Sequence, residues 1–139
     1  MLVLRAAELS RQGLSAREAG QILDEEVPHI CQYFTVDDLN FLKRSGRVSG
    51  ATAAIGTVLN IKPILYGSAD GHIVACGKVR GRKKAIDTLV ETYAKKQVDA
   101  ANHLVAISHG DCLADAQLLA EKVRAVAAPK DILIVPHEP

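Results

Sequence analysis

Tryptophan is absent from the 139-residue sequence, and aromatic residues make up only 4% of it. Proteins that bind single-stranded nucleic acid stack the bases on aromatic side chains along a basic groove. The formal net charge of this chain is +1, so it creates no strong field that would attract a polyanion. The sequence therefore predicts no nucleic-acid partner.

Cysteine is scarce, and long apolar runs are missing. The three cysteines, Cys31, Cys76 and Cys112, are far apart and odd in number, which favours a reducing cytoplasmic compartment over a disulfide framework. No apolar run approaches the roughly 18 residues of a membrane span. Arg5 and Glu8 interrupt the apolar start of the chain, which is unlike a signal peptide. We expect a cytoplasmic location.

Motifs for metal binding and catalysis are also lacking. His109 and Cys112 have the spacing of two metal ligands, but no second pair follows at the distance that a zinc site needs. The segment between Gly77 and Gly81 lacks the sequence of a nucleotide-binding phosphate loop. No Gly-x-Ser-x-Gly nucleophile motif is found either. We therefore expect no metal, no cofactor and no catalysis by this chain alone.

The composition that remains is that of an ordinary folded domain. Hydrophobic residues make up 48% of the chain and charged residues 24%. The length fits one domain, so residues 1–139 are expected to form a single domain. Apolar spacing and turn residues predict helices over 2–12, 16–27, 37–46, 50–59, 82–97 and 111–127, and strands over 31–36, 61–67, 72–79, 103–109 and 131–135. This order predicts an α/β fold, a two-layer sandwich with a mixed β-sheet.

Local signals support several of these boundaries. Ser15 and Glu18 have the spacing of a capping box. The Asp70–Gly71 pair predicts a hairpin between two strands. Thr35, Asp37 or Asp38 would cap the third helix, and Asp111 would cap the last helix.

The main candidate site is a basic corner between a strand and a helix. Lys78, Arg80, Arg82, Lys83 and Lys84 place five positive charges within seven residues. Arg80 comes just before a helix start, where free N–H groups and the helix dipole favour an anion. We predict a phosphate or carboxylate contact for Arg80. The alternative is that these residues are only a solvated corner.

Other candidates each have a structural alternative. Arg47 follows Gly46 at a helix end, where it would either interact with the helix dipole or bind an anion bidentately. Lys62 precedes Pro63 between apolar residues, and a buried lysine would need a partner. The apolar segment 50–59 includes Ile55, Val58 and Leu59, which would form either core or a wall for an acyl chain.

Three consecutive segments carry a resemblance to a known family. They are FTVDDLNFLKRSGRVSG at 34–50, LNIKPILYGSADGHI at 59–73 and GKVRGRKKA at 77–85. Their motifs and the spacing between them resemble those of the DegV family. The resemblance covers nearly all of the chain and is weakest over 1–30 and 98–130.

The resemblance implies a function in lipid metabolism. DegV proteins hold a long-chain fatty acid between two α/β domains, and many present it to a fatty acid kinase, whose acyl phosphate product enters phospholipid synthesis. This chain would then be the carboxy-terminal, lipid-binding half, with the amino-terminal domain absent. The family's head-group His would lie in a Gly- and Pro-rich loop after Pro139, so His137 should not be taken for it.

On this interpretation the ligand is a long-chain fatty acid and the protein partner is the kinase's catalytic subunit. Arg47, Arg80 and Lys62 would contact the phosphate or carboxylate, and Ile55, Val58 and Leu59 would contact the acyl chain. Transient contact with a membrane surface is left open. Two alternatives remain: a regulatory domain that docks a kinase, and a phosphotransfer enzyme that uses the cationic corner.

Overall fold

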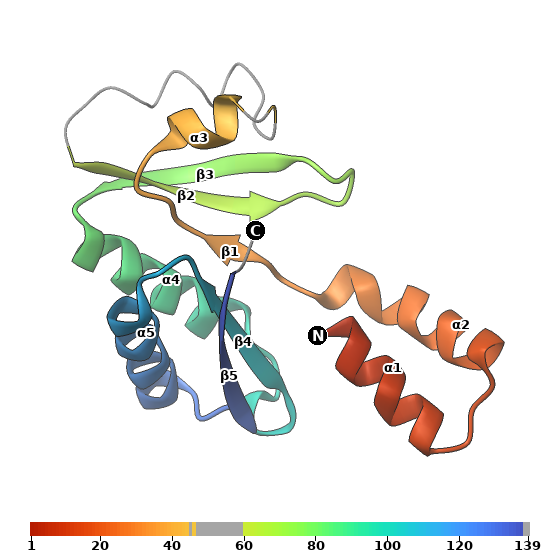
Figure 1. The fold of residues 1–139 in the computed structure, drawn as a ribbon. Coiled ribbons are helices and arrows are strands. Elements are labelled where there is room, and N and C mark those ends of the chain that lie inside the picture. Colours follow the sequence, from red (N-terminus) through yellow and green to blue (C-terminus); the bar gives the residue numbers. More distant parts are fainter. Residues whose placement is uncertain (45, 47–59, 138–139) are drawn as a thin grey trace. The chain divides into compact units, whose positions relative to one another are not determined.

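The structure is a computed structural model that describes residues 1–44, 46 and 60–137 (Figure 1). The chain divides into two compact units, Met1–Gln32 and Tyr33–Pro139. The predicted helix over 50–59 lies outside the described residues. The expectation of a single domain stays a prediction, and each unit is described by itself below.

The first unit is a pair of helices, α1 (Leu2–Arg11) and α2 (Ala16–Glu26), followed by a short 3-10 helix over Val27–His29. Both helices agree with the sequence pattern. The predicted capping box is confirmed, because the Ser15 side chain accepts from the Glu18 N–H while the Glu18 carboxylate accepts from the Ser15 N–H at 2.8 Å. Gly13, at φ +87°, makes the turn between the helices.

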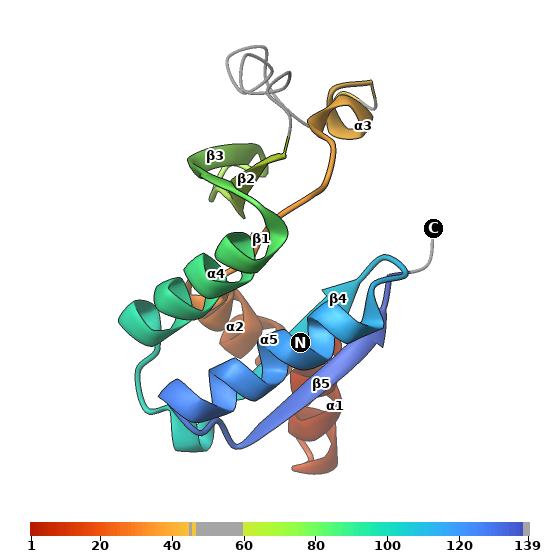
Figure 2. The same cartoon turned by 90° about the vertical axis from the view of Figure 1, so that its left-hand side faces the viewer.

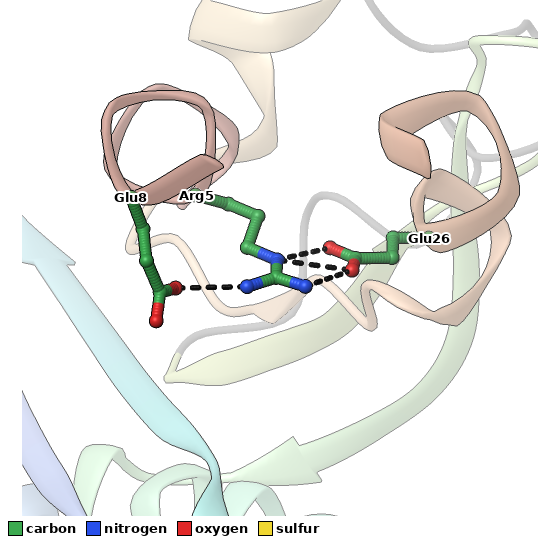
Figure 3. A network of polar contacts seen from close by, with 3 residues as sticks. All are labelled: Arg5, Glu8 and Glu26. Atoms are coloured by element: carbon green, nitrogen blue, oxygen red, sulfur yellow. Dashed lines mark hydrogen bonds and ion pairs between the residues drawn. The ribbon is translucent and has the colours of Figure 1, made fainter. Parts of the chain in front are cut away.

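One arginine joins the two helices of this unit (Figure 3). Arg5 Nε and Nη2 donate to Glu26 Oε1 at 3.0 and 2.8 Å, and Arg5 Nη1 donates to Glu8 Oε2 at 2.9 Å. Glu8 lies on the same helix as Arg5, whereas Glu26 ends the other helix. The arginine therefore clamps the start of α1 to the end of α2 through a bidentate contact.

The second unit contains two sheets. Strands β1 (Tyr33–Phe34), β2 (Ile61–Gly67) and β3 (Ile73–Arg80) form an antiparallel sheet in the order β1-β2-β3. Strands β4 (Leu104–His109) and β5 (Asp131–Pro136) form a parallel pair. The α/β class is confirmed, and both kinds of strand pairing occur, in two sheets. The first predicted strand, over 31–36, is reduced to two residues.

The helices of the second unit are α3 (Leu39–Arg44), α4 (Arg82–Lys96) and α5 (Leu113–Val126), with a 3-10 turn over Ala100–Asn102. Helix α4 contacts β2 and β3 as well as α5, and α5 contacts β4 and β5. Figures 1 and 2 accordingly show α4 between the antiparallel sheet and α5. This arrangement brings the start of α4 close to the start of α5.

The buried side chains follow these layers. One cluster joins α4, α5 and the parallel strands, and consists of Val90, Ile107, Ala116, Ala120, Val123 and Ile132. On the antiparallel sheet, Leu65 is fully buried, with Ile64 beside it and Ala85 and Ile86 of α4 also buried. Small alanines on α5 let the helix lie close to the strands, where close packing stabilises the interior.

The predicted hairpin is confirmed, with a five-residue connection. The Gly71 N–H donates to the Ser68 carbonyl at 3.0 Å, and Gly71 adopts φ +82°. Connections of this length are commonly built around such a turn with glycine in the left-handed region. The ladder shifts register between Ile64 and Leu65, which pair with Gly77 and Ala75, so Cys76 is the extra residue of a bulge in β3.

Two predicted helix caps are wrong. Helix α5 begins after Cys112, which makes no side-chain capping bond, and Asp111 lies in the preceding turn at φ +53°. The hydroxyl of Thr35 is buried and has no hydrogen-bond partner among the described residues, so it does not cap α3 there. At Asp111 the turn conformation sets where the carboxylate can reach. Of the helices in the described ranges, none combines the length and apolar character needed to cross a bilayer.

Candidate functional site

The basic corner forms where the hairpin leads into α4. Arg80 ends β3, Gly81 turns the chain at φ +87°, and Arg82 opens α4. The Gly81 N–H donates to the carbonyl of Asn60 at 2.8 Å, just before the start of β2. This bond fixes the turn against the neighbouring strand. A side chain at position 81 would be strained by the positive φ.

Arg82 connects this corner to α5. Its Nε donates to Asp115 Oδ2 at 2.7 Å, and its Nη2 lies 3.4 Å from the sulfur of Cys112. Asp115 lies in the first turn of α5, where a carboxylate is favoured by the helix dipole. Partial burial opposes the charge on Arg82, but the hydrogen bond to Asp115 and the nearby aspartates raise the pKa of the guanidinium above its ordinary value.

Lys62 has the partner that its burial requires. The lysine side chain is only 13% exposed, and its Nζ lies 2.6 Å from Asp37 Oδ1. The same carboxylate oxygen lies 3.7 Å from Arg82 Nη1. The hydrogen bond from Lys62 is the main reason that the pKa of Asp37 is lowered, and the charge of Arg82 adds to it. Asp37, Lys62, Arg82 and Asp115 thus form one network, named here the corner network.

Three of the five positive charges in the basic segment remain free. Lys78, Arg80 and Lys83 are exposed, and none of them forms an ion pair within the part of the chain that the structure describes. Lys84 is paired with Glu91 at 3.4 Å, and Arg82 belongs to the corner network. The corner therefore offers free cations beside the start of α4, which is a suitable surface for an anionic partner.

The structure does not bring all of the predicted site residues together. In the ladder, Arg80 lies opposite Ile61 and Lys62 lies opposite Val79. Because neighbouring residues in a strand point to opposite faces, Lys62 and Arg80 occupy opposite faces of the hairpin. The other predicted contacts, Arg47, Ile55, Val58 and Leu59, lie outside the described residues and stay predictions.

Sequence reasoning missed most of the corner network. The sequence pattern predicts Asp37 only as a helix cap, and no motif marks Asp115. The only sequence signal was that a lysine between apolar residues needs a counter-charge. The partner could not be identified, because the pairs form between segments far apart in the chain.

Comparisons with known proteins agree with this fold. The sequence profile of the family described as "Uncharacterised protein, DegV family" matches residues 1–139. A DegV domain-containing protein of Clostridium perfringens is 41% identical over 134 residues, which cover 96% of this chain and 46% of that protein.

Two solved structures are similar over nearly the whole chain. A fatty acid binding DegV family protein of Streptococcus agalactiae has a TM-score of 0.83 at 32% identity, covering 97% of this chain and 47% of that one. A DegV family protein of Thermus thermophilus, solved in a study of its fatty acid binding, has a TM-score of 0.80 at 32% identity, covering 98% and 49%. The chain thus spans about half the length of these relatives. The match over all residues and the shared architecture show that the chain belongs to the DegV family.

Proposed function

We propose that this chain is part of a protein that binds a long-chain fatty acid. The supporting observation is its similarity, over nearly its whole length, to the fatty acid binding DegV proteins of S. agalactiae and T. thermophilus. Burial of each methylene contributes about 0.8 kcal/mol, so a long acyl chain supplies most of the binding free energy without polar contacts. Ile55, Val58 and Leu59 remain the proposed contacts for the acyl chain.

The chain's contribution at the polar end of the ligand would be positive charge. A fatty acid ends in a carboxylate, and its acyl phosphate carries a charge of nearly −2. Arg80 is exposed, lies next to the start of α4 and has two further free cations, Lys78 and Lys83, close in sequence. A cation at this place stabilises the phosphorylated form more than the acid. We include Arg47 with Arg80 as a proposed head-group contact.

We further propose that the free cations serve presentation of the bound acid to a fatty acid kinase. Three exposed charges of one sign favour association with an anionic surface through electrostatic steering. The alternative function, a regulatory domain that docks a kinase, would use the same surface. It differs from the proposed function only in that the protein would carry no lipid. We propose binding rather than phosphotransfer catalysis, because Asp37 and Asp115 at this corner are already held by cations and are poor general bases in that state.

Lipid titration tests this function. Delipidated full-length gene product should bind oleate saturably in a calorimetric titration. The chain of residues 1–139 alone should bind far more weakly if the ligand needs a second domain as its other wall. Methyl oleate, which has the same acyl chain but no charge, should bind the full-length product more weakly than oleate if cations hold the head group. Absence of saturable oleate binding to the full-length product would refute the proposal.

A further inference from the structure

Two partly buried cations share one exposed carboxylate oxygen in the corner network. Asp37 Oδ1 lies 2.6 Å from Lys62 Nζ and 3.7 Å from Arg82 Nη1. The side chains of Lys62 and Arg82 are 13% and 29% exposed, whereas that of Asp37 is 74% exposed. The carboxylate therefore lies on the solvent side of two cations that are themselves recessed.

One of the two cations is held by a second carboxylate besides Asp37, and the other is anchored through its backbone. Lys62 belongs to β2 and is held in the ladder opposite Val79. Arg82 is held by its 2.7 Å bond to Asp115. Asp37 lies in a bend between β1 and α3 and is part of neither element. Removal of the Asp37 carboxylate would therefore leave Arg82 in position and free the ammonium group of Lys62 for another anion.

The helix ends add positive potential at the same place. Arg82 is the first residue of α4, and its contacts with Cys112 and Asp115 bring it to the first turn of α5. Neither helix has a side-chain cap at its start. The free N–H groups and dipoles of both helices thus favour an anion near Arg82.

We propose that Lys62 and Arg82 form an anion subsite for a phosphate group, which Asp37 occupies as an internal competitor when no ligand is bound. The subsite is separate from Arg80, which lies on the other face of the hairpin. Water competes for the Asp37 carboxylate, because that side chain is 74% exposed, and an incoming dianion, which carries more charge, can displace it. The inference goes beyond the proposed function, because it assigns a phosphate site distinct from the head-group contact proposed for Arg80.

Binding of inorganic phosphate to the 139-residue chain tests the subsite without any lipid. At about pH 8 phosphate is largely dianionic. Asp37→Asn keeps the shape of the side chain and removes its charge. It should bind phosphate about 10-fold more tightly than the natural chain, as expected when a charged competitor is removed. Lys62→Met in the Asp37→Asn background should abolish that gain.

Asp87→Asn is the matched control. Asp87 of α4 is paired with Lys122 of α5 at 2.9 Å. Its substitution therefore changes the net charge by the same amount as Asp37→Asn does and leaves the ion pairs of Lys62 and Arg82 in place. It should alter phosphate affinity by less than about 2-fold, because charges farther away are screened by salt. Equal affinities of Asp37→Asn and Asp87→Asn would overturn the proposal. Acetate, a monoanion, should bind Asp37→Asn more weakly than phosphate does, and equal binding would overturn the assignment to phosphate.

The natural chain gives an independent result if Asp37→Asn does not fold. In a phosphate titration followed by NMR, the side-chain signals of Lys62 and Asp37 should shift together, and those of Lys122 and Asp87 should stay in place. Unchanged Lys62 signals at high phosphate would contradict the subsite. Oleate binding to the full-length product is a separate measurement, so the subsite can fail while the proposed lipid binding holds.

Discussion

Arg82 Nε lies 2.7 Å from Asp115 Oδ2, and this ion pair joins the first turn of α4 to the first turn of α5. The two side chains are about one third exposed, at 29% and 35%. The contact is therefore screened by solvent only in part, and it contributes both to stability and to the position of the basic corner.

Asp115→Asn should lower the free energy of unfolding by about 1 kcal/mol, a value between those of exposed and buried charged pairs. Urea unfolding followed by circular dichroism would measure it. Asp111→Asn is the control, because Asp111 is exposed, forms no ion pair among the described residues and adopts φ +53°, a conformation that asparagine tolerates. If the two variants are equally stable, the Arg82–Asp115 pair contributes nothing to the free energy of unfolding.

The antiparallel sheet should depend on Leu65, whose side chain is fully buried. Leu65→Ala removes apolar contacts and leaves a cavity, so the unfolding free energy should fall by about 2–5 kcal/mol. Leu113→Ala, at a residue that is 51% exposed, should change it by less than about 0.5 kcal/mol. Similar losses in both variants would mean that Leu65 is not part of the core.

The Asp87–Lys122 pair predicts a pH dependence of stability. The hydrogen bond from Lys122 holds the pKa of Asp87 below its ordinary value of 3.8. A carboxyl with a depressed pKa in the folded state adds stability that is present above the ordinary pKa and is lost as the pH falls through the lower, folded value.

Asp87→Asn should therefore reduce the melting temperature at neutral pH, and the difference from the natural chain should shrink below about pH 4. Differential scanning calorimetry over a pH series would measure this. Lys122→Met, which removes the other partner, should show the same convergence. A melting-temperature difference that stays constant from neutral pH to about pH 3 would contradict the assigned pair.

Arg80→Ala should affect acyl-phosphate formation but not fatty-acid binding. Fatty-acid affinity of the full-length product should change little, because apolar burial supplies most of it. Acyl-phosphate formation with a fatty acid kinase should fall about 10- to 100-fold if one charged hydrogen bond is lost. Arg80→Lys should restore only part of the rate, because the bidentate geometry is gone.

Arg124→Ala is the control for that experiment, because Arg124 is exposed in the last turn of α5 and belongs to no proposed site. It should leave both affinity and acyl-phosphate formation unchanged. If Arg80→Ala supports acyl-phosphate formation at the rate of the natural protein, Arg80 is only a solvated charge at the corner.

The regular elements were predictable because their signals are local. Apolar spacing located α4 and α5 to within a few residues, Ser15 and Glu18 located the start of α2, and Asp70–Gly71 located the hairpin turn. The α5 cap was wrong because a local rule assigned to Asp111 a conformation that its turn does not adopt. Local signals therefore gave the elements but not the details of every boundary.

The site was less predictable because it depends on tertiary contacts. Lys62 could be recognised as a lysine that needs a partner, but its partner, Asp37, reaches it only after the strands pair. The pairing of Arg82 with Asp115 likewise requires α4 to pack on α5. The distribution of the strands over two sheets is also set by packing that no segment specifies alone.

Native mass spectrometry of the full-length gene product tests the central proposal most directly. The protein, purified without denaturation from a bacterial host, should carry a long-chain fatty acid, and a delipidated sample should take up added oleate to the same complex. A protein that carries no fatty acid after purification and takes up none from excess oleate would contradict the proposed lipid-binding function.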